Sequence, residues 1–432
     1  MKPSGATGPN RLTSLIMVGL ILGIVVGYVC HALAPDEAAA RTISGYFSII
    51  TEVFLRLIKM IIAPLVFSTL VAGIASLGDT KAVGRIAVKA LGWFISASLV
   101  SLTLGMLLVN TLAPGANLNL PLPPAGAETH LKAASLNFHD FVTHVFPTSA
   151  IQAMAQNEIL QILVFSVFFG FALASLSDET AKTLVNSIGE LVHVMLRITD
   201  YVMRVAPLGV FAAIASVITV QGLGVLVTYG KFVGEFYFGL VILWGVLILA
   251  GSVVLRSSMW TLLGLIREPM LLAFSTASSE AAYPRIMEQL EKFGVRDRVT
   301  GFVLPLGYSF NLDGSMMYQA FAAIFIAQAY NIHLSFGQQI TLLLVMMITS
   351  KGIAGVPRAS LVVVAATLPM FNLPEAGLLL IMGIDQFLDM GRTATNVVGN
   401  SIATAVVATW EGELVTPAIE EVPALIPELR PR

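Results

Sequence analysis

The polar residues between Asp385 and Asn400 follow one another at spacings that place them on one face of an α-helix. Asp385, Asp389, Arg392, Asn396 and Asn400 are separated by four, three, four and four residues. The rest of this segment is mostly Ile, Leu, Met, Val, Ala and Gly. Because ionisable groups are costly in a membrane helix, we interpret this face as a candidate functional site.

Arg392 and Asp389 have the chemistry to bind a small zwitterion. A guanidinium can hold a carboxylate through two parallel N–H donors, and a carboxylate one turn earlier can hold an ammonium group. The pair therefore predicts a zwitterionic ligand with an extra carboxylate. The alternative is an Asp–Arg pair that only joins helices, but such a pair would not need five aligned polar positions.

A second polar cluster lies between Gly307 and Ser315. Its polar members alternate with a period of two, which a regular membrane helix would not place on one face: Ser309, Asn311, Asp313 and Ser315. We predict a helix that is interrupted over 307–319, with carbonyl groups free to bind a cation or a substrate. The alternative is a glycine kink whose polar groups are satisfied locally.

Two further polar segments are predicted as tips of hairpins that enter the membrane. The serine-rich tip at Ser275–Glu280 offers hydroxyl and N–H groups to an anion, and the glycines of Ser350–Pro357 allow a tight, movable turn. Glu280 has no cation near it in sequence and is a candidate proton carrier. The alternatives are a simple re-entrant turn and a water-exposed Glu280.

The composition indicates a membrane protein. Of 432 residues, 56% are hydrophobic and 12% are charged, whereas soluble domains carry about 25% charged residues. A net charge of −2 speaks against a nucleic-acid partner, and no metal-ligand spacing, phosphate loop or nucleophile motif is found. We expect that the protein is not an enzyme, uses no cofactor and has no certain metal site. Apolar stretches long enough to span recur at 12–33, 43–77, 86–112, 151–176, 188–220 and 223–255.

The charges of the loops predict the orientation. Basic residues gather in the loops at 79–89 and 288–298, whereas the long connection 113–148 holds only Lys132. Because Lys and Arg concentrate on the cytoplasmic side, we place both basic loops and both termini there. Beyond residue 256 two similar units follow one another, each with a polar cluster midway in an apolar hairpin. In transporters, hydrophobic segments that are interrupted at corresponding positions of two repeats indicate the binding site.

Four motifs in order resemble the dicarboxylate/amino acid:cation symporters, the glutamate transporter family. They are Ser278-Ser279, Asn311-Leu-Asp-Gly-Ser315, Gly352-Ile-Ala-Gly-Val-Pro357 and Asp389-Met-Gly-Arg-Thr-Ala-Thr-Asn396. The resemblance covers nearly the whole chain. It implies an all-α membrane protein with eight transmembrane helices, two re-entrant helical hairpins and inverted repeats, assembled as a homotrimer. It also implies that a transport part moves like an elevator against a scaffold part.

The resemblance assigns roles to individual residues. Arg392 is expected to bind the substrate's side-chain carboxylate and Asp389 its amino group. The other expected substrate-binding residues are Thr393, Asn396, Ser315, Ser278, Ser279 and the backbone of Val356. The expected cation or proton coupling residues are Asp313, Asn311, Glu280, Gly307, Ser309 and Asn400.

The chain departs from the sodium-coupled members at several positions. Those members have an aspartate where this chain has Asn400, and a Tyr and a Thr where Phe94 and Ala97 align. Losing a carboxylate disfavours a hard cation, and the proton-coupled bacterial members resemble the chain here. The C4-dicarboxylate branch generally lacks the aspartate found at Asp389. The proton-carrying glutamate of eukaryotic members corresponds to Gln319.

We therefore predict a proton-coupled symporter of L-glutamate and L-aspartate in a bacterial inner membrane, among membrane lipids. Sodium coupling, C4-dicarboxylate uptake, a passive anion pore and a membrane-embedded enzyme are the alternatives. The predicted parts are scaffold helices 1 and 2 (1–77), transport helix 3 (78–113), an external loop with scaffold helices 4 and 5 (114–222), the remaining transport part (223–412) and a disordered cytoplasmic tail (413–432).

Overall fold

The computed structural model describes residues 9–77, 80–116, 143, 145–176, 178–223, 229–350 and 359–415. These residues form helices, and no strand occurs in the described ranges beyond an isolated bridge between Val295 and Leu414. The helices are α1 (Pro9–Leu33), α2 (Glu37–Leu77), α3 (Thr80–Leu112), α5 (Ala150–Gln156), α6 (Ile159–Ala174), α7 (Asp178–Met203), α8 (Ala206–Gln221), α10 (Gly230–Leu255), α11 (Ser258–Thr276), α12 (Ser279–Phe293), α13 (Asp297–Phe310), α14 (Asp313–Ala329), α15 (Phe336–Thr349), α16 (Ala359–Thr367), η2 (Leu368–Phe371), η3 (Glu375–Leu378), α17 (Leu379–Met382) and α18 (Asp385–Glu411).

Within the described residues, four helices are individually long and apolar enough to cross a membrane: Ser14–Leu33, Glu37–Ala75, Lys81–Leu112 and Gly230–Leu255. Large apolar side chains cover the outside of α10, where Val241, Leu249 and Val253 are 68%, 70% and 75% exposed. Lipid is the solvent that suits such a surface. The multi-pass membrane class is thus confirmed, whereas the count of eight spans and two re-entrant hairpins stays a prediction.

Two of the predicted spans are broken. The stretch 151–176 divides into α5 and α6, because Asn157 adopts a left-handed conformation with φ 55°. The stretch 188–220 divides into α7 and α8, which meet at an angle of 53°. Pro207 lies in the first turn of α8, and proline cannot continue a preceding helix. The pair counts as a fifth span if it crosses the membrane as one bent unit.

The first predicted hairpin is observed. Helices α11 and α12 pack against each other and are joined by Ala277, in a left-handed conformation, and Ser278. The Ser278 hydroxyl accepts a hydrogen bond from the Ala281 backbone N–H and so caps α12. The second predicted tip lies outside the described residues except for Ser350, between α15 and α16.

The predicted interruption at 307–319 is wrong in its length. Helix α13 continues to Phe310 and α14 begins at Asp313, so only Asn311 and Leu312 leave the helical path. Ser309 and Ser315 are therefore helical residues on either side of a two-residue break. The glycine at 314 allows α14 to approach α18, because a Cβ there would overlap the Arg392 backbone.

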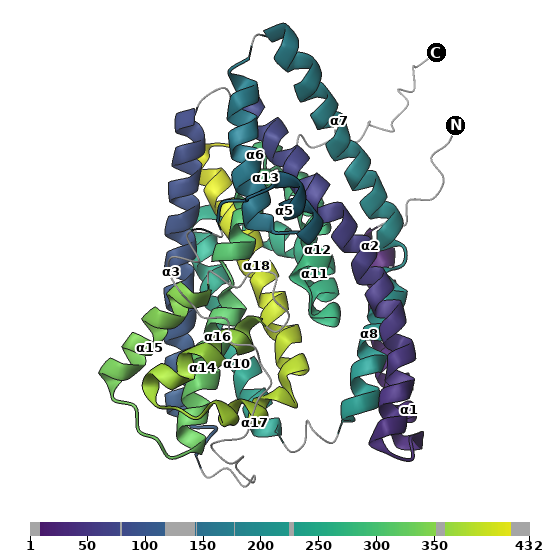
Figure 1. Ribbon diagram of the computed structural model, residues 1–432, viewed down its shortest axis with the longest axis vertical. Helices are drawn as coiled ribbons and strands as arrows, with labels where there is room; N and C mark the ends of the chain where they lie inside the picture. Colours follow the sequence, from purple (N-terminus) through teal and green to yellow (C-terminus); the bar gives the residue numbers. More distant parts are fainter. Residues whose placement is uncertain are drawn as a thin grey trace, which may run out of the picture.

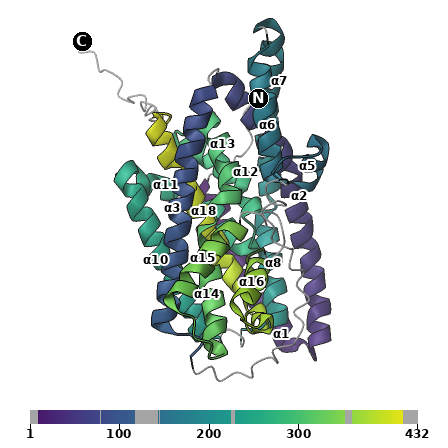
Figure 2. The same cartoon turned by 60° about the vertical axis from the view of Figure 1, so that its left-hand side comes forward.

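The helices pack in two groups (Figure 1). Helices α1, α2 and α5–α8 form the α2 group, whereas α3 and α10–α17 pack around α18, directly or through α14, and form the α18 group with it. Figure 2 shows α3 running along the outside of the α18 group. The α11–α12 hairpin and α13 lie between the groups: the hairpin contacts α18 as well as α2, α7 and α8, and α13 contacts α3 and α18 as well as α2 and α6. The division into a scaffold and a transport part stays a prediction.

The two basic segments predicted as loops are mostly helical, since 80–89 belongs to α3 and 288–293 and 297–298 belong to α12 and α13, and they meet at the C-terminal end of α18. Arg85 and Lys89 of α3 form ion pairs with Glu411 at 3.0 and 2.7 Å, and Arg298 forms one with Glu413. The two loops are thus on the same side of the molecule, as the orientation from loop charges requires. That this side is cytoplasmic stays a prediction.

Candidate functional site

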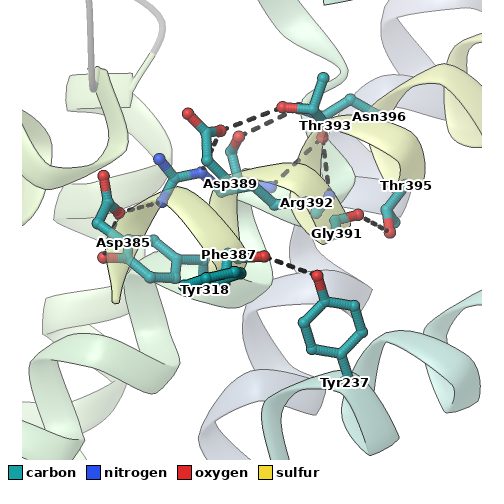
Figure 3. A network of polar contacts seen from close by, with 12 residues as sticks. Tyr237, Tyr318, Asp385, Phe387, Asp389, Gly391, Arg392, Thr393, Thr395 and Asn396 are labelled. Atoms are coloured by element: carbon teal, nitrogen blue, oxygen red, sulfur yellow. Dashed lines mark hydrogen bonds and ion pairs between the residues drawn. The ribbon is translucent and has the colours of Figure 1, made fainter. Parts of the chain in front are cut away.

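Arg392 lies buried between two carboxylates of its own helix (Figure 3). Its Nη1 donates to Asp385 Oδ1 at 3.0 Å and its Nε to Asp389 Oδ1 at 2.8 Å. The three residues share one face because they are three, four and seven positions apart in α18. The polar face that the sequence predicts is therefore confirmed as a continuous helical feature.

The aromatic ring of Tyr318, in α14, packs against one face of the Arg392 guanidinium. The guanidinium carbon lies 4.3 Å from the centre of the Tyr318 ring, and the Tyr318 hydroxyl donates to Asp385 Oδ1 at 3.1 Å. A planar guanidinium is attracted to an aromatic face, and the phenol keeps Asp385 in place. Because the side chain is held at both edges and on one face, Arg392 is preorganised for a ligand.

The exposure of the two carboxylates differs. The side chains of Asp385 and Arg392 are 1% and 2% exposed, whereas Asp389 is 23% exposed. Two carboxylates around one guanidinium leave one negative charge in excess if both are ionised. The accessible part of that charge is at Asp389, which can bind an ammonium group, while guanidinium donors outside the two ion pairs can bind a carboxylate.

Asn396 joins the face to the start of α14. Its Oδ1 accepts hydrogen bonds from the N–H groups of Gly314 and Ser315 at 2.9 and 3.3 Å, and its Nδ2 donates to the Ser315 hydroxyl at 3.1 Å. These N–H groups have no partner within α14 because they belong to its first turn. Thr393 donates to Asp389 Oδ1 at 3.1 Å. Arg392, Asp389 and Thr393 thus form one hydrogen-bonded set, and Asn396 and Ser315 form a second set further along the same face of α18.

A second cluster surrounds the break between α13 and α14. Asn311 Nδ2 donates to Asp313 Oδ2 at 3.1 Å, and Ser101 of α3 lies 3.5 Å from Asp313 Oδ1. Gly307 lies against the Asn400 side chain, and Gly399 against the Asp313 carboxylate. Three buried side-chain oxygens of this cluster have no hydrogen-bond partner among the described residues: Ser309 Oγ, Asn311 Oδ1 and Asn400 Oδ1. Such oxygens are suited to a cation or a proton donor.

We expect Gly399→Ala to damage this cluster. A Cβ at position 399 would overlap the Asp313 carboxylate, so either Asp313 or α18 must shift. Overpacking of this kind costs about 1–3 kcal/mol. The thermal stability of the purified protein and its transport rate should both fall. Gly383→Ala is the matched control, since a Cβ there meets nothing within 4 Å, and it should behave like the wild type.

The contacts of the hairpin tip differ from those of the network around Arg392. The Ser279 carbonyl accepts a hydrogen bond from the Tyr308 hydroxyl at 2.7 Å, and Ser278 caps its own helix. Neither contact includes Arg392 or Asp389, so the substrate-binding role of the two serines stays a prediction. Glu280 does have a cationic neighbour, because Lys59 of α2 lies 3.3 Å from its Oε2. Val356 lies outside the described residues.

Asp385 belongs to the predicted polar face, and the structure adds its contact with Arg392. Two further contributors were not predicted as site residues. Tyr318 and Lys59 act from other helices, and local sequence carries no signal for contacts across so many residues.

Residues 12–410 match the family model described as the sodium:dicarboxylate symporter family. The chain belongs to the sodium:dicarboxylate symporter family. The resemblance seen in the four sequence motifs is thus confirmed. The symporter is therefore a membrane transport protein rather than a soluble binding protein.

Curated relatives of this symporter have two kinds of names. It is 41% identical to the C4-dicarboxylate transport protein of Rhodospirillum rubrum, with 94% of this chain and 90% of the relative covered. It is also 41% identical to the proton/glutamate-aspartate symporter of Escherichia coli, with 92% of each covered. The proton/sodium-glutamate symport protein of Bacillus caldotenax is 40% identical, with 92% and 94% covered. Overall identity therefore does not separate amino acids from C4-dicarboxylates.

Proposed function

We propose that the symporter carries L-glutamate and L-aspartate together with protons. The observation that carries the substrate class is the accessible Asp389 beside the buried Arg392. An acidic amino acid places its side-chain carboxylate on Arg392 and its ammonium group on Asp389. A C4-dicarboxylate has no ammonium group and would meet Asp389 with like charge.

The chemistry of the second cluster supports proton coupling. Asp313 is its one carboxylate among the described residues, and the Asn311, Asn400 and Ser309 oxygens are neutral. The buried Phe94 ring of α3 lies beside Gly307 and offers no ligand oxygen. A site with one carboxylate and an apolar wall holds a hard cation weakly, whereas a proton needs only one carboxylate. Glu280 and Asp313 are the candidate proton carriers, since Asp389 must stay charged to hold the ammonium group.

Sodium coupling is the second candidate. It is favoured by the unpaired Asn311 and Asn400 oxygens, which could ligate a cation together with Asp313. The same substrate site would then work with a different driving ion. C4-dicarboxylate uptake is the alternative for the substrate.

We further propose that a homotrimer in a bacterial inner membrane carries out this transport by an elevator movement. In that mechanism the α18 group, which holds both polar clusters, moves past the α2 group. The packing in two groups with the α11–α12 hairpin between them supports this proposal. Both termini are placed in the cytoplasm, on the side where the basic loops meet.

Calorimetry in sodium-free buffer tests the proposed substrate. Purified protein should bind L-glutamate and L-aspartate at least about tenfold more tightly than succinate, because a charge-assisted hydrogen bond contributes about 1.5–3 kcal/mol. Equal or tighter binding of succinate would contradict the amino acid assignment and favour the C4-dicarboxylate alternative.

A further inference from the structure

The α11–α12 hairpin is held to the α2 group by ion pairs at two levels. Glu280, in the first turn of α12, pairs with Lys59 of α2 at 3.3 Å. Five residues later, Arg285 Nη1 pairs with Asp200 of α7 at 3.4 Å. Both pairs cross from one helix group to the other. Any movement of the hairpin along α2 must therefore separate them.

The two ion pairs leave different residues behind when they separate. Arg285 also donates to Glu268 of α11 at 2.8 Å and pairs with Glu288 of its own helix, so its charge stays compensated within the hairpin. Among the ion pairs of the described residues, Lys59 is the cation that faces Glu280. Separation from α2 would thus leave the Glu280 carboxylate without its counter-charge.

The location makes that loss costly. Lys59 lies within the span Glu37–Ala75, and its side chain is half exposed while that of Glu280 is 25% exposed. An unpaired ionised group at membrane depth is costly unless water reaches it or a proton neutralises it. A carboxylate can become neutral by accepting a proton, whereas the half-exposed Lys59 side chain can be solvated without its partner.

Two phenols also lie near Glu280. Tyr308 of α13 donates its hydroxyl hydrogen bond to the Ser279 carbonyl, and the Tyr283 ring of α12 contacts the Tyr308 ring edge to face with 5.0 Å between centres. Neither phenol supplies a positive charge to Glu280. Among the ion pairs of the described residues, Lys59 therefore supplies the positive charge beside Glu280.

We propose that Lys59 is the counter-ion that displaces the coupled proton from Glu280. In this structure the hairpin lies against Lys59, and the Glu280–Lys59 ion pair is formed. When the hairpin leaves Lys59, the carboxylate takes up one proton from water and becomes a neutral carboxylic acid. On return, the proton goes back to water and Lys59 keeps its own protons. This inference rests on the proposed proton-coupled function and gives Lys59 a positioning role in it.

Two transport modes of Lys59→Gln in proteoliposomes test the inference. Net uptake driven by a proton gradient requires release of the proton, whereas exchange of labelled for unlabelled glutamate does not. Losing a partly buried ion pair of this kind should lower net uptake by about tenfold or more and leave exchange near the wild-type rate. Glu280→Gln should show the same split. Arg56→Gln, one turn away on an exposed side chain, is the control and should keep both rates.

A charge-swapped variant distinguishes a role of Lys59 in displacing the proton from an ion pair that only holds the hairpin to α2. Lys59→Glu with Glu280→Lys restores an ion pair but moves the carboxylate from the hairpin to α2, so net uptake should stay low. Restored net uptake, or a Lys59→Gln variant with unchanged net uptake, would overturn the inference. Loss of exchange together with net uptake in Lys59→Gln would also overturn it, since a structural defect would then explain both. A wild type without proton-driven uptake would instead contradict the proposed function.

Discussion

Replacing Arg392 by lysine is expected to lower uptake of glutamate and aspartate by at least about thirtyfold. Lysine keeps the positive charge between Asp385 and Asp389 but loses the planar fork and the stacking on Tyr318. Truncating one partner of a buried, hydrogen-bonded charge pair costs about 2–5 kcal/mol, which corresponds to this range. Initial rates of labelled glutamate uptake, normalised to the amount of folded protein, measure the effect.

Arg392→Lys is a sharper variant than Arg392→Ala. Alanine would leave two buried or partly buried carboxylates without a cation and would destabilise the protein as well as the site. If a lysine variant folds and still transports glutamate at the wild-type rate, Arg392 has only a structural role as the ion-pair partner of Asp385 and Asp389. That result would support the alternative of a structural Asp–Arg pair.

Replacing Asp389 by asparagine is expected to change substrate selectivity more than it changes folding. Asparagine retains an oxygen for Arg392 Nε and Thr393, but it cannot offer a negative charge to an ammonium group. Glutamate uptake should fall by about tenfold or more, and inhibition of the remaining uptake by succinate should strengthen. Competition assays with unlabelled glutamate and succinate measure the ratio.

Asp385→Asn is the matched control for this change. Asp385 also contacts Arg392, but it is buried and shares its oxygen with the Tyr318 hydroxyl. Its loss should weaken the orientation of Arg392 and so reduce binding of glutamate and succinate to a similar degree. If Asp389→Asn also reduced both substrates equally, Asp389 would be another positioning carboxylate and would carry no selectivity.

The polar face of α18 could be predicted from the sequence because its residues are close together in the chain. Asp385, Asp389 and Arg392 repeat at helical spacing within an apolar segment, so the shared face can be derived from the geometry of one helix. The α11–α12 turn at Ala277 and Ser278 is local in the same way, since its polar residues stand between two apolar runs.

Other features depend on contacts that are distant in sequence. Tyr318 lies beneath Arg392 only because α14 packs against α18, and Lys59 meets Glu280 only because α12 packs against α2. The alternation of polar residues from Ser309 to Ser315 suggested a long unwound segment. Two non-helical residues suffice, because the Asn396 side chain accepts the first N–H groups of α14.

Uptake of radiolabelled glutamate into proteoliposomes of the purified protein tests the central claim most directly. Either an inward proton gradient without sodium or an inward sodium gradient at equal pH is imposed. The proposed function predicts accumulation above equilibrium with the proton gradient alone, and none with the sodium gradient alone. Accumulation that strictly requires sodium would contradict it, and would mean that Asn311, Asp313 and Asn400 still form a cation site.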